Sequence, residues 1–210
     1  MRGAGATPPP VPLARGDVAK AAESLAEAFH DYPLLVHAAP DLGRRLRLAQ
    51  AFCAVALHYA VRWGEAHATS PGFEGVAAWV EGAHFPMTGA KALRAVPFLS
   101  FLSLGRHGGS QLRAAGAHLD AMHRRLAPPR HTFLFILGVR PEFRGQGHVG
   151  RLLRPVLNRL DRERRPCYVD TVNPAAVPLY EHFGFRVLER SPIPRSGLTA
   201  WALLRDPPPP

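Results

Sequence analysis

Apolar and polar residues alternate with the period of an α-helix along the first sixty residues. Leu25, Ala28 and Phe29 share one face of a helix that Asp17 can cap and that we expect to run to about His30. A longer helix is predicted from Asp41 to Trp63, because Gly64 would stop it there. Its apolar face is formed by Leu42, Leu46, Ala49, Cys53, Leu57 and Ala60.

The pattern then switches from helix to strand and back. A short first strand is expected over Val11–Arg15, and two more over Glu65–Thr69 and Gly75–Val80, joined by a turn at Ser70–Gly72. Residues 85–127 follow these strands, and their apolar spacing predicts two helices, over 89–104 and 110–126. We expect breaks between these helices at Gly105 and at Gly108–Gly109.

The second half alternates strands with helices. Phe133–Val139 is a continuous apolar run, as expected for a strand that is covered on both faces. A helix should follow to about Glu163, kinked at Pro155, and then a strand over Cys167–Val172 and a short helix from Asn173. Two strands, over 185–189 and 198–204, complete the chain. This order predicts an α/β (α+β) fold of three layers, with a mixed sheet of about six to seven strands flanked by helices.

Length and composition indicate where the folded domain begins and ends. With 210 residues and 47% hydrophobic residues, the chain can bury one full core, which we place at residues 13–205. The Pro- and Gly-rich residues 1–12 are expected to be a flexible leader, and residues 206–210 a flexible tail. There is no signal-peptide pattern and no apolar run that could span a membrane. Cys53 and Cys167 are expected to be reduced and buried, which favours the cytoplasm.

The net charge of +10 raises the question of nucleic-acid binding. Nearly all basic residues are arginines, since Lys20 and Lys91 are the only lysines, and the arginines are scattered along the chain. No basic run is interleaved with aromatic residues, as a single-strand binder would require. We therefore do not expect nucleic acid as a partner, but a positive field would attract a small phosphorylated ligand.

One glycine-rich stretch has the features of an anion-binding site. Arg144-Gly145-Gln146-Gly147-His148-Val149-Gly150-Arg151 connects the apolar strand to the next helix. Unpaired N–H groups at a helix start attract anions, and glycines let a phosphate approach them without Cβ interference. Arg144 would add a cationic fork. The alternative interpretation is an ordinary tight turn with a surface arginine.

Two well-known phosphate loops fit this stretch poorly. A Walker loop requires Gly-Lys-Ser/Thr, which is missing. The spacing from Gly145 to Gly150 does match G-x-G-x-x-G, and Asp170 lies about where a ribose-binding acid should be. However, five residues separate Val139 from Gly145, and too few residues follow Asp170 to build a doubly wound sheet.

The pattern Val139-x-Pro141-x-Phe143-Arg144-Gly145-x-Gly147 instead resembles the acetyl-CoA loop of the GNAT superfamily of N-acetyltransferases, Gln/Arg-x-x-Gly-x-Gly/Ala. Arg144 and Gly147 match, whereas Val149 stands at the last position of the pattern and departs from it. A second stretch, Asn173-x-x-Ala176-x-x-Leu179-Tyr180-Glu181-x-x-Gly184-Phe185, resembles the family's closing motif. The resemblance covers residues 133–189, so we place the acetyl-CoA-binding core at about 131–190.

This resemblance implies a sheet that is splayed near its middle, with the pantetheine arm of acetyl-CoA in the gap. It implies that Tyr180 is the general acid that protonates the departing thiolate, and that Asn173 lies on the cofactor side. The backbone of Leu137, Gly138 and Val139 would then serve the pantetheine amides, and the loop from Arg144 to Arg151 the pyrophosphate. Each has a structural alternative: Tyr180 can be a packing residue, Asn173 a helix cap and Gly138 part of a bulge.

The general base is less well determined. No acid lies in Phe133–Val139, so the family's strand-borne glutamate is missing. Asp170 and Glu81 are candidates, and so are His37, His58 and His84, because imidazole titrates near neutral pH. A water chain could serve instead. Neither a metal site nor a nucleophilic triad is indicated by the spacing of His, Cys and Ser.

The sequence therefore predicts an N-acetyltransferase that uses acetyl-CoA to acetylate a small-molecule or peptide amine, acting as a monomer or homodimer and independent of membranes. A non-catalytic CoA-binding sensor is the alternative, with a basic nucleic-acid binder third. Acceptor selectivity should lie in residues 30–60 and 85–129. We expect the two helices between residues 85 and 126 to cover the acceptor side of the cleft, since the thioester must be shielded from water.

Overall fold

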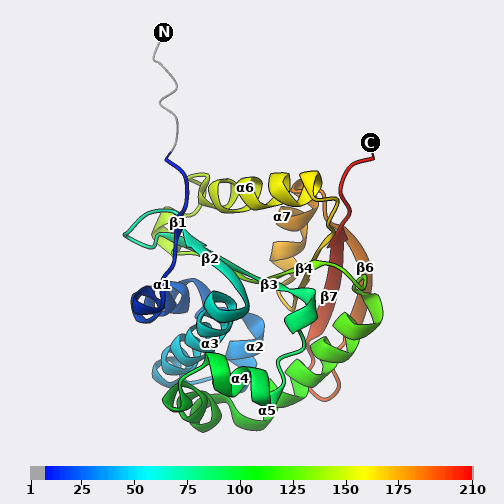
Figure 1. Ribbon diagram of the computed structural model, residues 1–210. Helices are drawn as coiled ribbons and strands as arrows, with labels where there is room; N and C mark the ends of the chain where they lie inside the picture. The colour runs from blue at the N-terminus through cyan, green and yellow to red at the C-terminus, as the bar shows by residue number, and fades with distance from the viewer. Residues whose placement is uncertain (1–7, 210) are drawn as a thin grey trace.

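A single mixed sheet of seven strands forms the middle layer of the fold (Figure 1). The computed structural model describes residues 8–209, apart from the side chains of residues 106–108 and 110. The strand order is β1-β2-β3-β4-β5-β7-β6, and all neighbours are antiparallel except β4 and β5. The strands are β1 (Val11–Pro12), β2 (Gly64–Ala68), β3 (Gly75–Glu81), β4 (Thr132–Val139), β5 (Cys167–Thr171), β6 (Arg186–Pro192) and β7 (Thr199–Arg205). The predicted three-layer α/β fold with a mixed sheet is confirmed.

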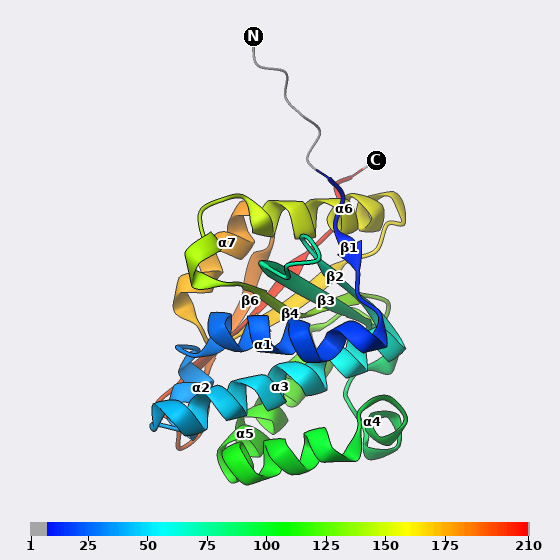
Figure 2. The ribbon, with the colours of Figure 1, turned by 90° about the vertical axis from the view of Figure 1, so that its left-hand side faces the viewer.

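Helices cover both faces of this sheet (Figures 1 and 2). One face carries α1 (Val18–Phe29), α2 (Pro33–Ala38), α3 (Leu42–Trp63), α4 (Gly89–Ala95) and α5 (Phe98–Leu126). The other carries α6 (His148–Arg162) and α7 (Val177–His182). No helix in the described part of the chain is long and apolar enough to span a membrane.

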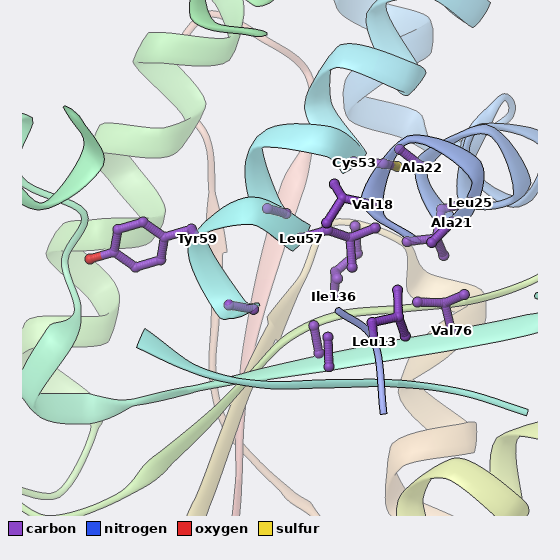
Figure 3. Packing of buried hydrophobic residues seen from close by; sticks show 14 of the residues in the cluster. Leu13, Val18, Ala21, Ala22, Leu25, Cys53, Leu57, Tyr59, Val76 and Ile136 are labelled. Atoms are coloured by element: carbon purple, nitrogen blue, oxygen red, sulfur yellow. The ribbon is translucent and has the colours of Figure 1, made fainter. Parts of the chain in front are cut away.

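The core on the five-helix face is built where α1 and α3 meet the sheet. Val18 and Leu25 from α1 and Leu57 from α3 pack with Ile136 and Val76 of the sheet (Figure 3). On the opposite face, α6 buries Leu153, Val156 and Leu160 against the sheet. The helix continues as one element through Pro155, the residue at which a kink was predicted.

The sheet is split between β4 and β5. Only two residue pairs, Thr132 with Cys167 and Phe133 with Tyr168, join these parallel strands. Further along, β4 continues to Val139 along β3, and β5 continues to Thr171 along β7, without pairing with each other. A bulge opposite Ala78 and Trp79 leaves Phe135 outside the regular β3–β4 register, at the level where the split opens. This is the splay that the family resemblance implied.

The helical segment between β3 and β4 differs from the prediction in where it breaks. The break falls at Val96–Pro97, since Val96 is extended and Pro97 forms the N-cap of α5. Gly105 lies inside α5, whereas the break predicted at Gly108–Gly109 is present as a kink at Gly109, with φ 40° and ψ −122°. Leu93 of α4 and Leu99 of α5 lie on either side of this break and are 71% and 75% exposed.

The structure also corrects the predictions for the two ends of the chain. Of the leader predicted over residues 1–12, residues 1–7 lie outside the described residues, whereas Val11 and Pro12 form β1 and pair with β2. In the predicted tail, Asp206 forms an ion pair with Arg186 at 3.0 Å. Cys53 and Cys167 are both free and buried, as expected.

Candidate active site

A cavity of about 810 Å³ passes through the split in the sheet. It is lined by β4 and β5 residues, by Val149 of α6 and Tyr180 of α7 on one face, and by Phe29 of α1 and Phe52 of α3 on the other. Helix α5 contributes a further wall, which confirms that the segment between β3 and β4 forms helices beside the cleft. Elements from both outer layers therefore meet at one site.

The glycine loop lies at one end of the cavity, where Arg144 is part of the lining. Gly145 and Gly147 have φ values of 76° and 80°, a conformation that favours glycine, and a Cβ on either would meet no atom within 4 Å. Gly147 is the N-cap of α6, so the first amide groups of that helix have no partner within the helix. Gly147 itself lines a second hollow, together with Gly150, Arg151 and Arg154, rather than the main cavity. A phosphate group can approach this backbone closely, and the loop fits the pyrophosphate site implied by the resemblance.

The side chains of this loop have other partners. Arg144 donates to the carbonyls of Ala28 and Val139, at 3.2 and 3.4 Å, and Gln146 donates to the carbonyl of Glu142 at 3.1 Å. His148 is 8% exposed and lies 3.1 Å from the Thr69 hydroxyl through Nδ1. Arg151 donates to the Thr69 carbonyl at 2.7 Å. The backbone N–H groups of Arg144 and Arg151 also have partners, the carbonyls of Pro141 and Gly147, so an anion would bind the N–H groups of the residues between them.

Val149 and Gly150 differ in whether they line the cavity. Val149 lines the cavity, so its branched side chain faces the site that the family keeps small at this position. Gly150 does not line it, and a Cβ there would lie 3.4 Å from Nε of Arg154. The departure at Val149 therefore adds apolar surface to the cavity.

Leu137, Gly138 and Val139 form the β4 wall. A Cβ on Gly138 would lie 2.7 Å from a Leu25 methyl carbon and 3.1 Å from Cβ of Ala28, so the glycine is required by the close packing of α1. Gly138 pairs regularly with Val76, so it is not part of a bulge. The β4 edge that faces β5 has lost its strand partner here, and its backbone groups are available to an extended ligand with amides.

Tyr180 occupies the opposite wall. Its side chain is 7% exposed, packs edge-on against Phe185 at 5.8 Å and lines the cavity. Burial, followed by the nearby Tyr32 and Asp170, raises the pKa of the Tyr180 phenol above its usual value, so this group stays protonated. Asn173 also lines the cavity, while its Oδ1 accepts the backbone N–H of Ala175 at 3.1 Å as a helix cap.

Asp170 faces the same cavity from β5. Burial, and then the negative charge of Asp120, raise the pKa of the Asp170 carboxyl to about 8. A carboxyl group that titrates near neutral pH can both hold and release a proton under the working conditions of an enzyme.

Two site residues had not been anticipated, Asp120 and Tyr32. Asp120 lines the cavity from α5, and burial raises the pKa of its carboxyl. It is the only acidic residue between Glu81 and Glu142, and this isolation among apolar residues was the signal available in the sequence. Tyr32 accepts the backbone N–H of Val172 at 3.2 Å through its hydroxyl, and burial raises its pKa to about 12. No motif marks Tyr32.

The other proposed bases lie elsewhere. Glu81 is exposed at the end of β3, beside the start of β4, and does not line the cavity. His37 and His58 are outside the lining, and burial, followed by Arg15, lowers the pKa of His58. The His84 ring lies against Trp63 at 4.6 Å. Among the candidate bases, Asp170 is the one that the structure brings to Tyr180; the side chains that the structure describes include no group of three or more potential metal ligands.

Comparison with known proteins identifies the architecture. Residues 98–185 match the Acetyltransferase (GNAT) family. A segment of 53 residues is 36% identical to an uncharacterized N-acetyltransferase of Schizosaccharomyces pombe, and this alignment covers 25% of the chain and only 22% of that protein.

Solved structures extend the likeness to nearly the whole chain. A histone acetyltransferase HPA2 and related acetyltransferase from Corynebacterium glutamicum has a TM-score of 0.66 at 21% identity, covering 97% of this chain and 98% of that one. The polyamine N-acetyltransferase of Drosophila melanogaster, which forms N-acetylagmatine, has a TM-score of 0.59 at 16% identity, covering 94% and 98%. Residues 98–185 therefore match the GNAT acetyltransferase family, and the chain as a whole has the fold of solved acetyltransferases.

Proposed function

We propose that the protein is an N-acetyltransferase that moves the acetyl group of acetyl-CoA directly to a primary amine. The observation that carries this proposal is the position of Tyr180 and Asp170, which face one cavity at the point where the sheet splits. The glycine loop supports acetyl-CoA as the donor, because its open backbone and the α6 N-terminus fit a pyrophosphate. The unpaired β4 edge fits the amides of the pantetheine arm.

Acetyl-CoA, when bound, supplies an acetyl thioester whose C–S bond breaks as the new C–N bond forms. Asp170 would accept the proton that the amine loses. Moving a proton from an ammonium of pKa about 10.4 to an ordinary aspartate of pKa about 3.9 is uphill by about 9 kcal/mol. With the pKa of Asp170 raised to about 8, the same transfer is uphill by only about 3 kcal/mol.

Tyr180 would deliver a proton to the departing sulfur from the other side. Its raised pKa keeps the phenol protonated and makes it a hydrogen-bond donor at every pH near neutrality. Since a thiol has a pKa of about 8.5, a hydrogen bond or a proton from Tyr180 stabilises the charge that develops on sulfur. Asp170 would thus accept a proton from the amine, and Tyr180 would donate one to the sulfur.

The donor assignment is tested at Gly147. Gly147→Asp and Gly147→Asn have nearly the same shape, and Asn and Asp both tolerate a positive φ, so the two variants differ mainly in charge. We expect acetyl-CoA affinity, measured by calorimetry, to fall at least 10-fold further in the Asp variant, because its carboxylate repels the pyrophosphate. Equal affinities in two folded variants would overturn the pyrophosphate assignment, and acetyl-CoA binding without thiol release for any amine would favour a sensor.

A further inference from the structure

The part of the cavity enclosed by α1, α3 and α5, here named the acceptor chamber, has mainly apolar walls. Aromatic rings from four different elements line it, namely Phe29, Phe52, Phe85, Phe101 and Phe135. Phe85 packs edge-on against Phe135 at 6.0 Å, so these rings form a continuous surface. Such a surface binds an apolar group by the area that it removes from water.

Few polar groups face this chamber, and they gather at its inner end. Asp120 of α5 and Asp170 of β5 line it, and no hydrogen bond or ion pair joins either carboxyl group to a described side chain, although the charge of Arg124 acts to lower the pKa of Asp120. Tyr180 is 7% exposed there, and its hydroxyl likewise has no partner in the described part of the chain. The negative charge of Asp120 disfavours ionisation of Asp170 in this poorly solvated space, and a cation between the two groups would stabilise both as carboxylates.

The rest of the lining is not suited to a second cation. Besides the two aspartates, its charged residues are Arg113, Arg144 and Asp31, all exposed; Arg144 belongs to the glycine loop, and the Asp31 carboxylate already lies 2.9 Å from the His30 ring. The other lining residues of the chamber are mainly apolar. A ligand with two separated ammonium groups would place its second charge against hydrocarbon or near arginine, and burial of an unpaired charge is costly.

We propose that the acceptor is a primary monoamine on an apolar aryl or alkyl chain, with its ammonium between Asp120 and Asp170 and its chain among the aromatic residues of the chamber. This inference rests on the proposed function. The ammonium loses one proton to Asp170, and the free amine then forms the C–N bond. As the C–S bond breaks, Tyr180 protonates the sulfur and regains a proton from the second N–H that the nitrogen loses. Asp120 acts as a positioning residue through its charge.

The first test is a panel of amines with the intact protein and acetyl-CoA, followed by release of free thiol. 2-Phenylethylamine and hexylamine should show kcat/KM at least 10-fold above propylamine, spermidine and agmatine. Acetyl-CoA binding is measured separately by calorimetry. Binding and thiol release with spermidine or agmatine preferred would overturn this inference and leave the proposed function intact, whereas absence of acetyl-CoA binding would overturn the proposed function and with it this inference.

Gly116 offers a sharper test of the chamber. It lies one helical turn before Asp120 on α5, lines the cavity, and has no atom within 4 Å of where its Cβ would be. Gly116→Leu should therefore fold and fill the chamber, lowering kcat/KM for 2-phenylethylamine at least 10-fold while changing acetyl-CoA affinity less than 2-fold. Gly89→Leu, at an equally open helix position outside the cavity, is the control. Unchanged selectivity in Gly116→Leu would contradict the placement of the apolar chain.

The carboxylate pair is tested by Asp120→Asn, which keeps the shape of the side chain. Without the Asp120 charge, Asp170 should titrate at lower pH, so the acidic limb of the kcat/KM profile should move down by about one pH unit while KM for the amine rises. Asp206→Asn, which alters an exposed ion pair with Arg186, is the matched control. A lower rate with an unmoved limb would reduce Asp120 to a structural role and overturn the pairing.

Discussion

At the scale of single residues, Tyr180 illustrates how a buried phenol can serve one half of a reaction. Tyr180→Phe removes one hydroxyl and keeps the ring against Phe185, so folding and acetyl-CoA affinity should be preserved. We expect kcat to fall by about 10²–10⁴-fold, because the departing sulfur loses its proton donor. Steady-state thiol release with the preferred amine checks this, and wild-type turnover in the variant would make Tyr180 a packing residue.

Asp170 carries a cost in stability that follows from its raised pKa. The folded protein keeps the Asp170 proton up to pH of about 8, whereas the unfolded chain loses it near pH 4, so folding stability falls as the pH rises through this window. Asp170→Asn removes the penalty and should stabilise the protein more at pH 8.5 than at pH 5, by about 1–3 kcal/mol once cavity water is allowed for.

Urea unfolding at the two pH values measures the difference, and thiol release should be lost in the same variant. A stability gain that is independent of pH would show that Asp170 is ionised in the folded protein near neutrality. The exposed Asp206→Asn variant provides the baseline, since its carboxylate is not buried.

At the scale of elements, the junction of α1 with β4 depends on one missing Cβ. Gly138→Ala would place a carbon 2.7 Å from the Leu25 methyl and 3.1 Å from Cβ of Ala28, and α1 must then move away from the strand. Overpacking of this kind should lower the free energy of unfolding by about 1–3 kcal/mol. Chemical denaturation measures it, with Gly16→Ala as a control whose Cβ would meet no atom within 4 Å.

Elements with strong periodicity were predictable, and those decided by single backbone constraints were not. α1, α3 and α6 follow their apolar stripes to within a few residues. The break before α5 was missed because Gly105 was given more weight than Pro97, although a proline disfavours helix at the residue before it. α2 was also missed, since its six residues are too few to show a period.

The residues of the candidate site also fall into those that the sequence predicts and those that only the fold reveals. The glycine loop, Asn173 and Tyr180 belong to contiguous motifs and were found from the sequence, whereas Asp120 and Tyr32 come to the cavity from distant segments. Asp170 was one of several acids and imidazoles of equal standing until the fold buried it beside Asp120. Loops and helix caps can be predicted from local sequence, whereas the carboxyl group that becomes buried is determined by tertiary packing.

At the scale of the whole molecule, a buried histidine pair should govern acid stability. His123 and His131 lie 2.8 Å apart through their Nε2 atoms, and Nδ1 of His131 lies 2.6 Å from the Pro128 carbonyl. Because that carbonyl only accepts, His131 donates through Nδ1 and His123 donates through Nε2. Nδ1 of His123 then has no partner among the described residues, and a proton added there would be buried without an acceptor.

Burial, followed by His131 and Arg124, lowers the pKa of His123 to about 3. The unfolded chain takes up this proton below pH of about 6.5, so stability should fall on acidification from there toward pH 3. Between pH 7.5 and 5 the wild type should lose about 2 kcal/mol more than His123→Gln, which retains a donor for His131. Urea titrations measure this difference, His37→Gln is the control, and equal losses in all three proteins would contradict the tautomer assignment.

The two-pair junction between β4 and β5 has one more consequence. A sheet normally ends in edges that face solvent, where another chain can add to them and start aggregation. Here the sheet has an additional pair of edges in its interior, with the backbone of Phe135–Val139 on one side and Val169–Thr171 on the other. A ligand with its own amides that paired with these inner edges would join two half-sheets that otherwise share only two residue pairs.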